Sequence, residues 1–211
     1  MIKFENWDNT LLSSLLDNIN YIIANLPEGG VYYDVGANTG LLTEKVIEER
    51  PDITCYLFEP VKEYYDHIKE RFKGNDKVIA FNFALMHDNE SALICKHDNN
   101  LGYNTMSFIS EYGSKEEIIC RTLSDVVEEY NIPKANLMKV DVEQSEYFLI
   151  EGCKKLFNTG VIPDIILMEI GVGVDHPGWP KEKEMIEYLF SLGYKKFDYE
   201  RNDTYDAIFR K

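Results

Sequence analysis

Apolar side chains recur every three or four positions at the start of the chain. The repeating residues are Trp7, Leu11, Leu12, Leu15, Leu16, Ile19, Ile22, Ile23 and Leu26. This spacing predicts an amphipathic helix that packs one face on a core, and Pro27 to Gly30 are expected to end it. Residues 1–30 are therefore predicted to form an N-terminal helix packed on a single domain, residues 31–211.

Beyond residue 30, short apolar runs alternate with segments of helical period. The predicted strands span 31–35, 53–58, 78–83, 136–142 and 164–170, and the predicted helices span 41–50, 61–72, 145–157 and 181–192. A recurring strand and helix indicates an α/β fold with a doubly wound, mostly parallel sheet. Two last runs, 195–199 and 205–210, are separated by a hairpin's length of polar residues, which predicts an antiparallel C-terminal strand.

The middle of the chain is more polar. Two further strand-like runs, 92–96 and 117–121, flank a polar loop at 97–114. A short helix to Tyr130 follows, for which Thr122 or Ser124 is the expected cap.

The net charge of the chain limits the classes of partner that it can bind. Lys and Arg number 22 against 37 Asp and Glu, a net charge of −15, which repels a phosphate backbone. Nucleic acid is therefore an unlikely partner on electrostatic grounds.

Three other features concern the compartment and the assembly. No apolar run approaches the roughly 20 residues that span a bilayer, and the first residues lack the layout of a secretory signal, so we expect a cytoplasmic protein. Four widely spaced cysteines, with no C-x-x-C, argue against a disulfide framework or a structural zinc. The sequence leaves open a homodimer through the N-terminal helix.

The segment 34–40, Asp-Val-Gly-Ala-Asn-Thr-Gly, sits where the first strand meets its helix. Ligands of open α/β sheets bind at this edge. The spacing Gly36-x-x-x-Gly40 is not the G-x-G-x-x-G of a dinucleotide site, and Asp34 suits a cationic group such as an α-amine. Glu59 ends the second strand, where nucleotide-binding folds place an acidic residue that accepts hydrogen bonds from ribose hydroxyls. The alternative for the first segment is a tight turn with a helix cap.

Together these motifs resemble the FkbM family of class I S-adenosylmethionine-dependent methyltransferases, over roughly residues 31–210. The matching segments are 34–40 (DVGANTG), 58–60 (FEP), 82–85 (NFAL), 122–125 (TLSD), 138–146 (MKVDVEQSE) and 167–170 (LMEI). The resemblance implies a Rossmann-like methyltransferase sheet with S-adenosylmethionine as the cofactor. One departure is Gln144, which stands where the family usually has Gly, so the turn after the fourth strand is expected to differ in shape.

The resemblance also implies a cofactor site. Its residues are Asp34, Gly36, Asn38, Gly40, Glu59, Asn82, Ala84, Leu85 and Asp141. The loop 36–40 would lie under the methionine part, Asp34 would face the amine, Glu59 would bind the ribose, and 82–85 would border the adenine.

Transfer to a hydroxyl benefits from a general base that takes its proton. Asp141, at the end of the fourth strand, is the first candidate, followed by Glu169 and His176. Lys139 shares the strand face of Asp141, so a buried ion pair is the alternative for Asp141 and Glu169. Glu143 and Glu146 are expected to begin a helix, where carboxylates interact favourably with the helix dipole.

A divalent cation held by Asp141 and Glu169 is a second, less favoured possibility. The loop 97–114 and the segment 171–180 would flank the pocket mouth. The candidate substrate-binding residues there are Tyr103, Asn104, Ser107 and Trp179, with Tyr112 as a further aromatic. Ordinary packing is the alternative for these aromatics.

The sequence thus predicts an O-methyltransferase acting on a hydroxyl of a sugar, a glycan or another small molecule. An RNA 2′-O-methyltransferase, an NAD-dependent dehydrogenase and a non-catalytic nucleoside-binding domain remain as alternatives. Fold alone does not choose among them.

Overall fold

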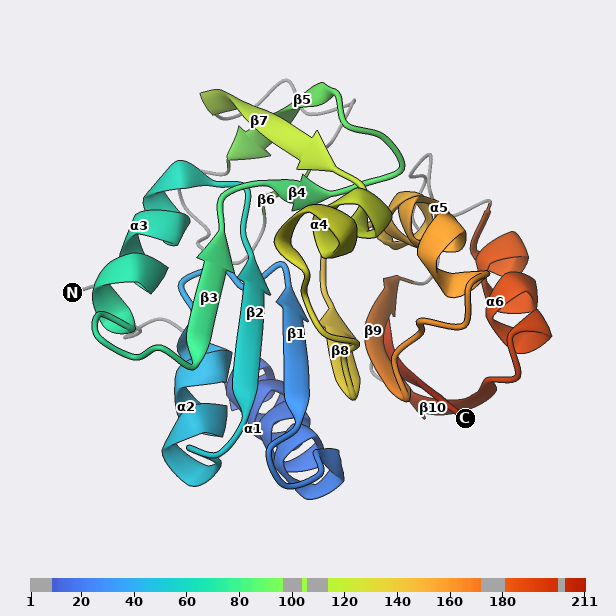
Figure 1. Ribbon diagram of the computed structural model, residues 1–211, viewed down its shortest axis with the longest axis horizontal. Coiled ribbons are helices and arrows are strands. Elements are labelled where there is room, and N and C mark those ends of the chain that lie inside the picture. The colour runs from blue at the N-terminus through green and yellow to red at the C-terminus, as the bar shows by residue number, and fades with distance from the viewer. Residues whose placement is uncertain (1–8, 97–103, 106–113, 172–180, 201–203) are drawn as a thin grey trace.

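The structure is a computed structural model of the 211-residue chain. It describes residues 9–96, 104–105, 114–171, 181–200 and 204–211 (Figure 1). Within these residues the chain forms a central sheet covered by helices, with a smaller sheet beyond one edge.

The central sheet has seven strands in the order β10-β11-β9-β8-β1-β2-β3. Its strands are β1 (Val31–Val35), β2 (Thr54–Phe58), β3 (Val78–Phe81), β8 (Leu137–Val140), β9 (Ile165–Gly171), β10 (Lys195–Glu200) and β11 (Thr204–Arg210). The pairs from β3 to β9 are parallel, whereas β11 runs antiparallel to both β9 and β10. The predicted fold class, with its antiparallel strand near the C-terminus, is confirmed.

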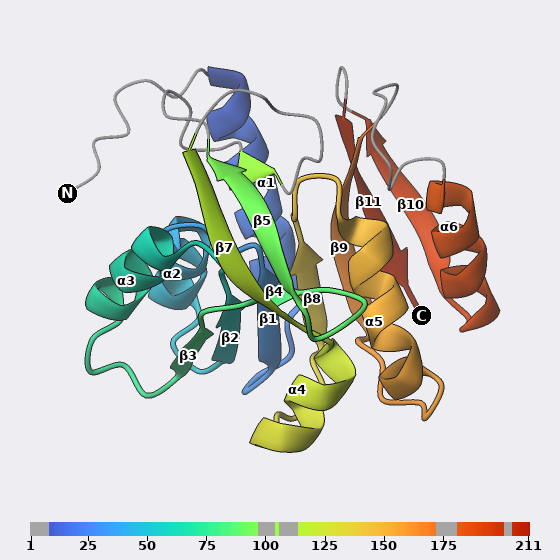
Figure 2. The ribbon, with the colours of Figure 1, turned by 90° about the horizontal axis from the view of Figure 1, so that it is seen from above.

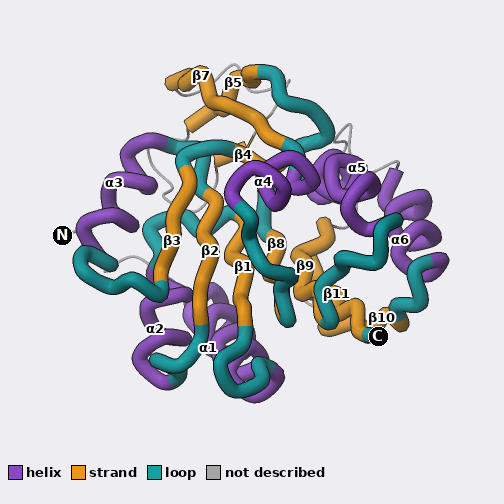
Figure 3. Tube along the Cα trace, in the orientation of Figure 1, coloured by secondary structure: helices purple, strands orange, loops and turns teal. Residues whose placement is uncertain are grey.

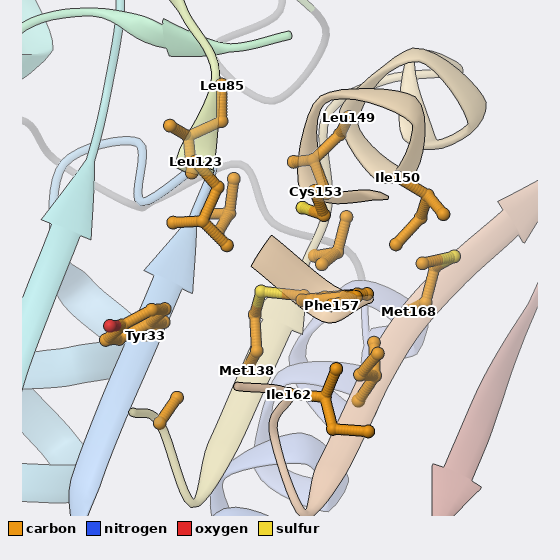
Figure 4. Close-up of a cluster of buried hydrophobic side chains, with 14 of the residues drawn as sticks. Tyr33, Leu85, Leu123, Met138, Leu149, Ile150, Cys153, Phe157, Ile162 and Met168 are labelled. Carbon is orange, nitrogen blue, oxygen red and sulfur yellow. The ribbon is translucent and has the colours of Figure 1, made fainter. Parts of the chain in front are cut away.

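Among the described residues, six helices cover the two faces of this sheet, three on each face (Figures 2 and 3). They are α1 (Asn9–Asn25), α2 (Leu41–Glu49), α3 (Lys62–Arg71), α4 (Leu123–Tyr130), α5 (Glu146–Phe157) and α6 (Glu182–Ser191). Alternate residues of a strand point to opposite faces, so Tyr33 packs with α4, α5 and α6 while Tyr32 packs with α1, α2 and α3. Figure 4 shows the first of these clusters, in which Met138 and Met168 of the sheet meet Leu149, Cys153 and other residues of α5.

The N-terminal helix packs against the core. Ile19, Ile22 and Leu26 of α1 are buried in the cluster under α2. The Arg50 guanidinium, just after α2, donates to the carbonyl oxygens of Ile23 and Leu26 at 3.1 and 2.8 Å. These bonds satisfy carbonyls that a helix end leaves without partners, which fixes the end of α1. No described helix has the length and apolar character needed to cross a membrane.

The middle of the chain forms a second, four-stranded sheet. It contains β4 (Ala84–Leu85), β5 (Ser91–Lys96), β6 (Asn104–Thr105) and β7 (Ser114–Arg121), in the order β4-β7-β5-β6. The small sheet lies beyond the edge to which β1, β2 and β3 run (Figure 1). The predicted strand 78–83 is therefore too long, because the chain leaves the central sheet after Phe81 and enters β4 at Ala84.

The N-cap of helix α4 is Thr122. Thr122 accepts a hydrogen bond at its hydroxyl from the backbone N–H of Asp125 and has an extended backbone, as an N-cap residue does. Ser124 is buried, donates to the carbonyl of Gly152 and accepts from the N–H of Leu156. Of the two candidates, Thr122 is the cap and Ser124 joins α4 to α5.

Candidate functional site

The turn after β1 requires glycine at Gly36. The N–H groups of Gly36 and Ala37 both donate to the carbonyl of Phe58, at 3.0 and 3.2 Å, which holds the turn against the end of β2. Gly36 has a φ of 77°, and a Cβ atom there would lie 1.9 Å from the carbonyl oxygen of Asp141. Only glycine permits this approach between the ends of β1 and β8.

The rest of the loop bends tightly into α2. Asn38 and Gly40 have left-handed φ values of 52° and 76°, and the N–H of Gly40 donates to the carbonyl of Ala37 at 2.9 Å. Gly40 is the residue preceding the first turn of α2. Its missing side chain leaves room for Phe72 and Ile68 of the α3 region, which a Cβ would meet at 2.9 and 3.2 Å.

Glu59 joins this loop to the second strand. One carboxylate oxygen accepts from the N–H of Asn38 at 2.8 Å, and the other accepts from the N–H of Val61 at 2.8 Å. The residue is only 5% exposed, and burial raises its pKa to about 8, although the two backbone donors act in the opposite direction. Each oxygen of a carboxylate accepts more than one hydrogen bond, so Glu59 retains acceptor capacity beyond these two backbone donors, and its contact with a ribose stays a prediction.

The turn after β3 lies beside Glu59. The amide of Asn82 donates to the carbonyls of Glu59 and Pro60, at 3.0 and 2.9 Å. Ala84 and Leu85 pair with β7 and pack into two hydrophobic clusters. The structure thus gives Ala84 and Leu85 a packing role, and their place beside an adenine stays a prediction.

Asp34 is buried near the carboxyl end of β1. Its side chain is fully buried, and one carboxylate oxygen accepts from the hydroxyl of Thr43 at 2.6 Å. Burial raises its pKa, and the nearby Lys139 opposes that rise. In this structure Asp34 contacts Thr43 and Lys139, and its place beside the amine of a cofactor stays a prediction.

Lys139 connects the ends of β1 and β8. Its Nζ lies 3.1 Å from a carboxylate oxygen of Asp141, 3.6 Å from Asp34 Oδ1 and 3.2 Å from the carbonyl oxygen of Gly36. Burial lowers the pKa of Lys139, but Asp141 and Asp34 more than offset this and raise it overall. The predicted ion pair with Asp141 therefore exists. Asp141, whose side chain is 36% exposed against 9% for Lys139, is the more open partner.

Further carboxylates gather around Asp141. Burial raises the pKa of Glu143, and the carboxylates of Asp141 and Glu169 raise it further. Glu169 lies near enough to Lys139 to act on its pKa as well. Because β8 and β9 are neighbours, the structure brings Asp141 and Glu169 to one edge, as the sequence indicated.

Glu146 is more than the acidic start of a helix. It is 6% exposed, and its Oε1 accepts from the N–H groups of Val142 and Gln144, each at 3.3 Å. Burial raises its pKa to about 7. Glu146 thus fastens the turn that follows Asp141.

That turn has a strained backbone at Gln144. Glu143 and Gln144 have φ values of 50° and 75°, a region that costs a non-glycine residue about 1–2 kcal/mol. The family's usual glycine would avoid this cost.

Gln144→Gly is therefore expected to raise the free energy of unfolding by about 0.5–1 kcal/mol, after allowing for the greater freedom of glycine in the unfolded chain. Urea unfolding measures the change. Gln144→Ala, which keeps the strain, should give no gain, and an equal gain from both variants would contradict this explanation.

Glu146 predicts a pH dependence of stability. Its ordinary pKa is 4.5 and its folded pKa about 7, so between these values the unfolded chain has lost the proton that the folded chain keeps, and stability falls as pH rises. Glu146→Gln retains an oxygen for both N–H groups and does not titrate. Its advantage over the wild type should be near zero at pH 4.5 and reach about 1–3 kcal/mol at pH 8.

Urea unfolding at several pH values measures this advantage. Glu128→Gln, at a 77% exposed side chain on α4, is the matched control and should show no such gain. A gain from Glu146→Gln that does not change with pH would contradict the assignment.

Several predicted site residues lie outside the described residues. These are His176, Tyr103, Ser107, Tyr112 and Trp179. Asn104 pairs with Lys96 through the backbone of β6 and β5; its side chain lies outside the description. Within the described part of the chain, no group of three or more His, Cys, Asp or Glu is arranged to hold a metal ion.

Sequence reasoning missed two contacts. Thr43 supports Asp34, and the only sequence signal is a polar residue between the apolar Leu42 and Val46 on the buried side of α2. The contact of Lys139 with the carbonyl of Gly36 depends on the order of strands β1 and β8, which no local pattern reveals.

These residues fit S-adenosylmethionine. The glycine-bearing loop after β1 lies against a buried carboxylate at the end of β2, and Asn82 holds the turn after β3 beside that carboxylate. The strand order places β11 antiparallel between β9 and β10, and solved methyltransferases of the Rossmann-like class share the overall fold. Fold and site together define a methyltransferase of this class.

The chain belongs to the FkbM methyltransferase family, since the model of the Methyltransferase FkbM domain matches residues 34–196. It is 27% identical to the hexuronic acid methyltransferase AglP of Haloferax volcanii over 174 residues, covering 81% of this chain and 68% of that protein. It is 24% identical to the methyltransferase sdnD of Sordaria araneosa over 164 residues, covering 63% of each.

Solved structures share the fold at low sequence identity. The precorrin-6y C5,15-methyltransferase of Geobacter metallireducens superposes with a TM-score of 0.55 at 11% identity, over 100% of this chain and 92% of that one. Fibrillarin of Aeropyrum pernix, solved with natively bound S-adenosylmethionine, gives 0.52 at 11% identity, over 88% of this chain and 68% of that one. The predicted family and fold are confirmed.

Proposed function

We propose that the protein transfers a methyl group from S-adenosylmethionine to a hydroxyl group of a sugar, free or within a glycan. The observation that supports this most is the joining of three strand ends at one place. Glu59 of the β2 end binds the loop after β1, and the Gly36 carbonyl of that loop lies within reach of Lys139, which also pairs with Asp141. The name of the relative AglP, a hexuronic acid methyltransferase, favours a sugar acceptor.

In this proposal the loop 36–40 and Glu59 hold the donor. When bound, S-adenosylmethionine supplies a methyl group on a positively charged sulfur that leaves as a neutral thioether. Glu59 would accept hydrogen bonds from the ribose hydroxyls, and the backbone of Gly36 to Gly40 would hold the methionine part. The protein mainly aligns the two reactants, which lowers the barrier by making the reaction effectively intramolecular.

Asp141 accepts the proton of the acceptor hydroxyl in this proposal. A carboxylate oxygen of Asp141 would take the hydroxyl proton as the acceptor oxygen gains the methyl group that the donor would supply. The partly exposed carboxylate of Asp141, after the end of β8, is open to an acceptor. Glu169 from the neighbouring strand is the second candidate for this role.

Two alternatives of other classes predict different ligands. The net charge of −15 and the carboxylates around Asp141 oppose an RNA backbone. The loop lacks the G-x-G-x-x-G pattern of a dinucleotide site. The charge favours a small-molecule acceptor over RNA, and the loop sequence favours S-adenosylmethionine over NAD.

Label transfer from methyl-labelled S-adenosylmethionine tests the proposal. The acceptors are neutral sugars, uronic acids and a short RNA. We expect label on a sugar hydroxyl, as a methyl ether that survives mild base. A base-labile product would indicate a methyl ester on a carboxylate, and label on RNA alone would contradict the proposed acceptor class.

Glu59 gives a test of donor binding. Glu59→Gln offers only one acceptor oxygen to two backbone N–H groups and replaces the other oxygen with an NH2 donor, so S-adenosylmethionine affinity should fall about 10- to 100-fold. Calorimetry measures the change. Glu70→Gln, at an exposed ion pair with Lys73, should bind as the wild type does. An unchanged affinity for Glu59→Gln would place the ribose elsewhere.

A further inference from the structure

We propose that Lys139 is a positioning residue that fixes the proton-accepting carboxylate of Asp141 to the donor-binding loop through a single ammonium group. This inference rests on the proposed function for the identity of the donor. It assigns to Lys139 a role in catalysis, exerted through Asp141, that a stabilising ion pair alone would not have.

The first observation is the set of groups around one nitrogen. Nζ lies 3.2 Å from the carbonyl oxygen of Gly36 and 3.1 Å from the Asp141 carboxylate, with Asp34 at 3.6 Å. A lysine ammonium has three N–H donors and no acceptor. Two of these partners belong to different parts of the site, since Gly36 is in the donor loop and Asp141 stands at the acceptor side.

The second observation is burial. The Lys139 side chain is 9% exposed and that of Asp34 has no exposed surface. In such surroundings ion pairs are screened little by solvent, and an ammonium deprived of a carboxylate partner is costly. The Lys139 chain is therefore held in one place, as a positioning group must be.

The third observation is the register of the strands. Lys139 lies directly opposite Asp34 in the parallel β1–β8 pair, and the N–H of Asp141 donates to the carbonyl of Val35 at 3.1 Å. The backbones of the two strand ends are thus tied together before Gly36. The ammonium of Lys139 extends that connection to the side chain of Asp141, so a shift of the loop moves Asp141 with it.

A simpler role for Lys139 is to neutralise Asp34. The two roles predict different outcomes for the double substitution Asp34→Asn with Lys139→Met, which removes both buried charges. If Lys139 only neutralises Asp34, stability and kcat should both recover relative to Lys139→Met. If Lys139 positions Asp141, stability should recover while kcat stays low.

The experiment measures kcat, the Kd of S-adenosylmethionine by calorimetry, and the urea midpoint without ligand. Lys139→Met should lower kcat about 30- to 100-fold and weaken donor affinity about tenfold. In the Asp141→Asn background the same change should lower kcat less than about threefold, because residues that act as a unit are non-additive. Asp34→Asn with Lys139→Met should regain the midpoint but less than about a third of the lost kcat.

Lys134→Met is the matched control. Lys134 pairs with Asp164 just before the first residues of β8 and β9, at the opposite end of β8 from Lys139, and its loss should leave kcat and Kd unchanged. Full recovery of kcat in the Asp34→Asn variant of Lys139→Met, or additive effects of Lys139→Met and Asp141→Asn, would overturn the proposal.

Failure of the proposed function would look different. A wild-type protein that binds no S-adenosylmethionine would contradict the donor assignment, whatever the variants do. The urea midpoints then still test the contact itself, since additive shifts for Lys139→Met and Asp141→Asn would show that the two side chains are not coupled.

Discussion

Gly36→Ala is expected to lower the free energy of unfolding by more than about 3 kcal/mol and to abolish binding of S-adenosylmethionine. The new Cβ would lie 1.9 Å from the carbonyl oxygen of Asp141, far inside any contact that atoms tolerate. Relief requires the ends of β1 and β8 to separate, which breaks the contacts of Lys139 and displaces the loop that carries Asn38. Urea unfolding and calorimetry measure the two effects.

Gly74→Ala is the matched control for Gly36→Ala. Gly74 also has a positive φ, of 82°, but no atom lies within 4 Å of where its Cβ would be. It should cost about 1–2 kcal/mol from backbone conformation alone and leave donor affinity unchanged. If Gly36→Ala lowered the free energy of unfolding no more than Gly74→Ala does, the result would contradict the close approach of the β1 and β8 ends.

Asp141→Asn is expected to lower kcat about 100- to 10,000-fold with little change in donor affinity. An amide cannot take the hydroxyl proton at neutral pH, while its shape still fits beside Lys139. The Kd of S-adenosylmethionine should stay within about threefold of the wild-type value, because the loop and Glu59 make the donor contacts. Single-turnover transfer and calorimetry separate the two quantities.

The control for Asp141→Asn is Asp164→Asn, at the carboxylate that pairs with Lys134 at the far end of β9. It should retain wild-type kcat. An Asp141→Asn protein that keeps at least half its rate would assign the proton to Glu169 or to another group.

The fold was predictable because its signals are local. The strands β1, β2, β8 and β9 are short apolar runs next to segments of helical period, and the polar residues before β11 predict the antiparallel strand. The sheet to which the middle strands β5 and β7 belong was not predictable in the same way. β5 and β7 read as ordinary strands, and only the turn at Asn82 and Phe83, with the pairing of Ala84 to Cys120, shows that they form a separate sheet.

The site residues that follow the ends of strands were predictable from the sequence, whereas the contacts of the buried residues were less so. Glu59 could be found by its place at the end of the second strand, since the carboxyl ends of parallel strands meet at one edge. Asp34 has an equally prominent sequence position, yet its side chain points under the loop toward Thr43 and Lys139. Side chains alternate between the two faces of a strand, so a shift of one residue in where the strand ends moves a strand-end side chain to the other face.

Gln144 shows what the family resemblance adds. The expectation that the turn differs in shape came from a missing glycine, and the structure gives Gln144 the left-handed φ of 75° that glycine favours. The turn therefore keeps a glycine-like backbone with a different residue. The neighbouring carboxylates, Glu143 and Glu146, take their raised pKa values from burial, which no local sequence pattern reports.

Calorimetric titration of the wild-type protein with S-adenosylmethionine, its demethylated product and NAD tests the central claim most directly. The loop after β1, held by Glu59, predicts saturable binding of S-adenosylmethionine and of the demethylated product, and no binding of NAD at the same concentrations. Binding of NAD in preference to S-adenosylmethionine would contradict the account.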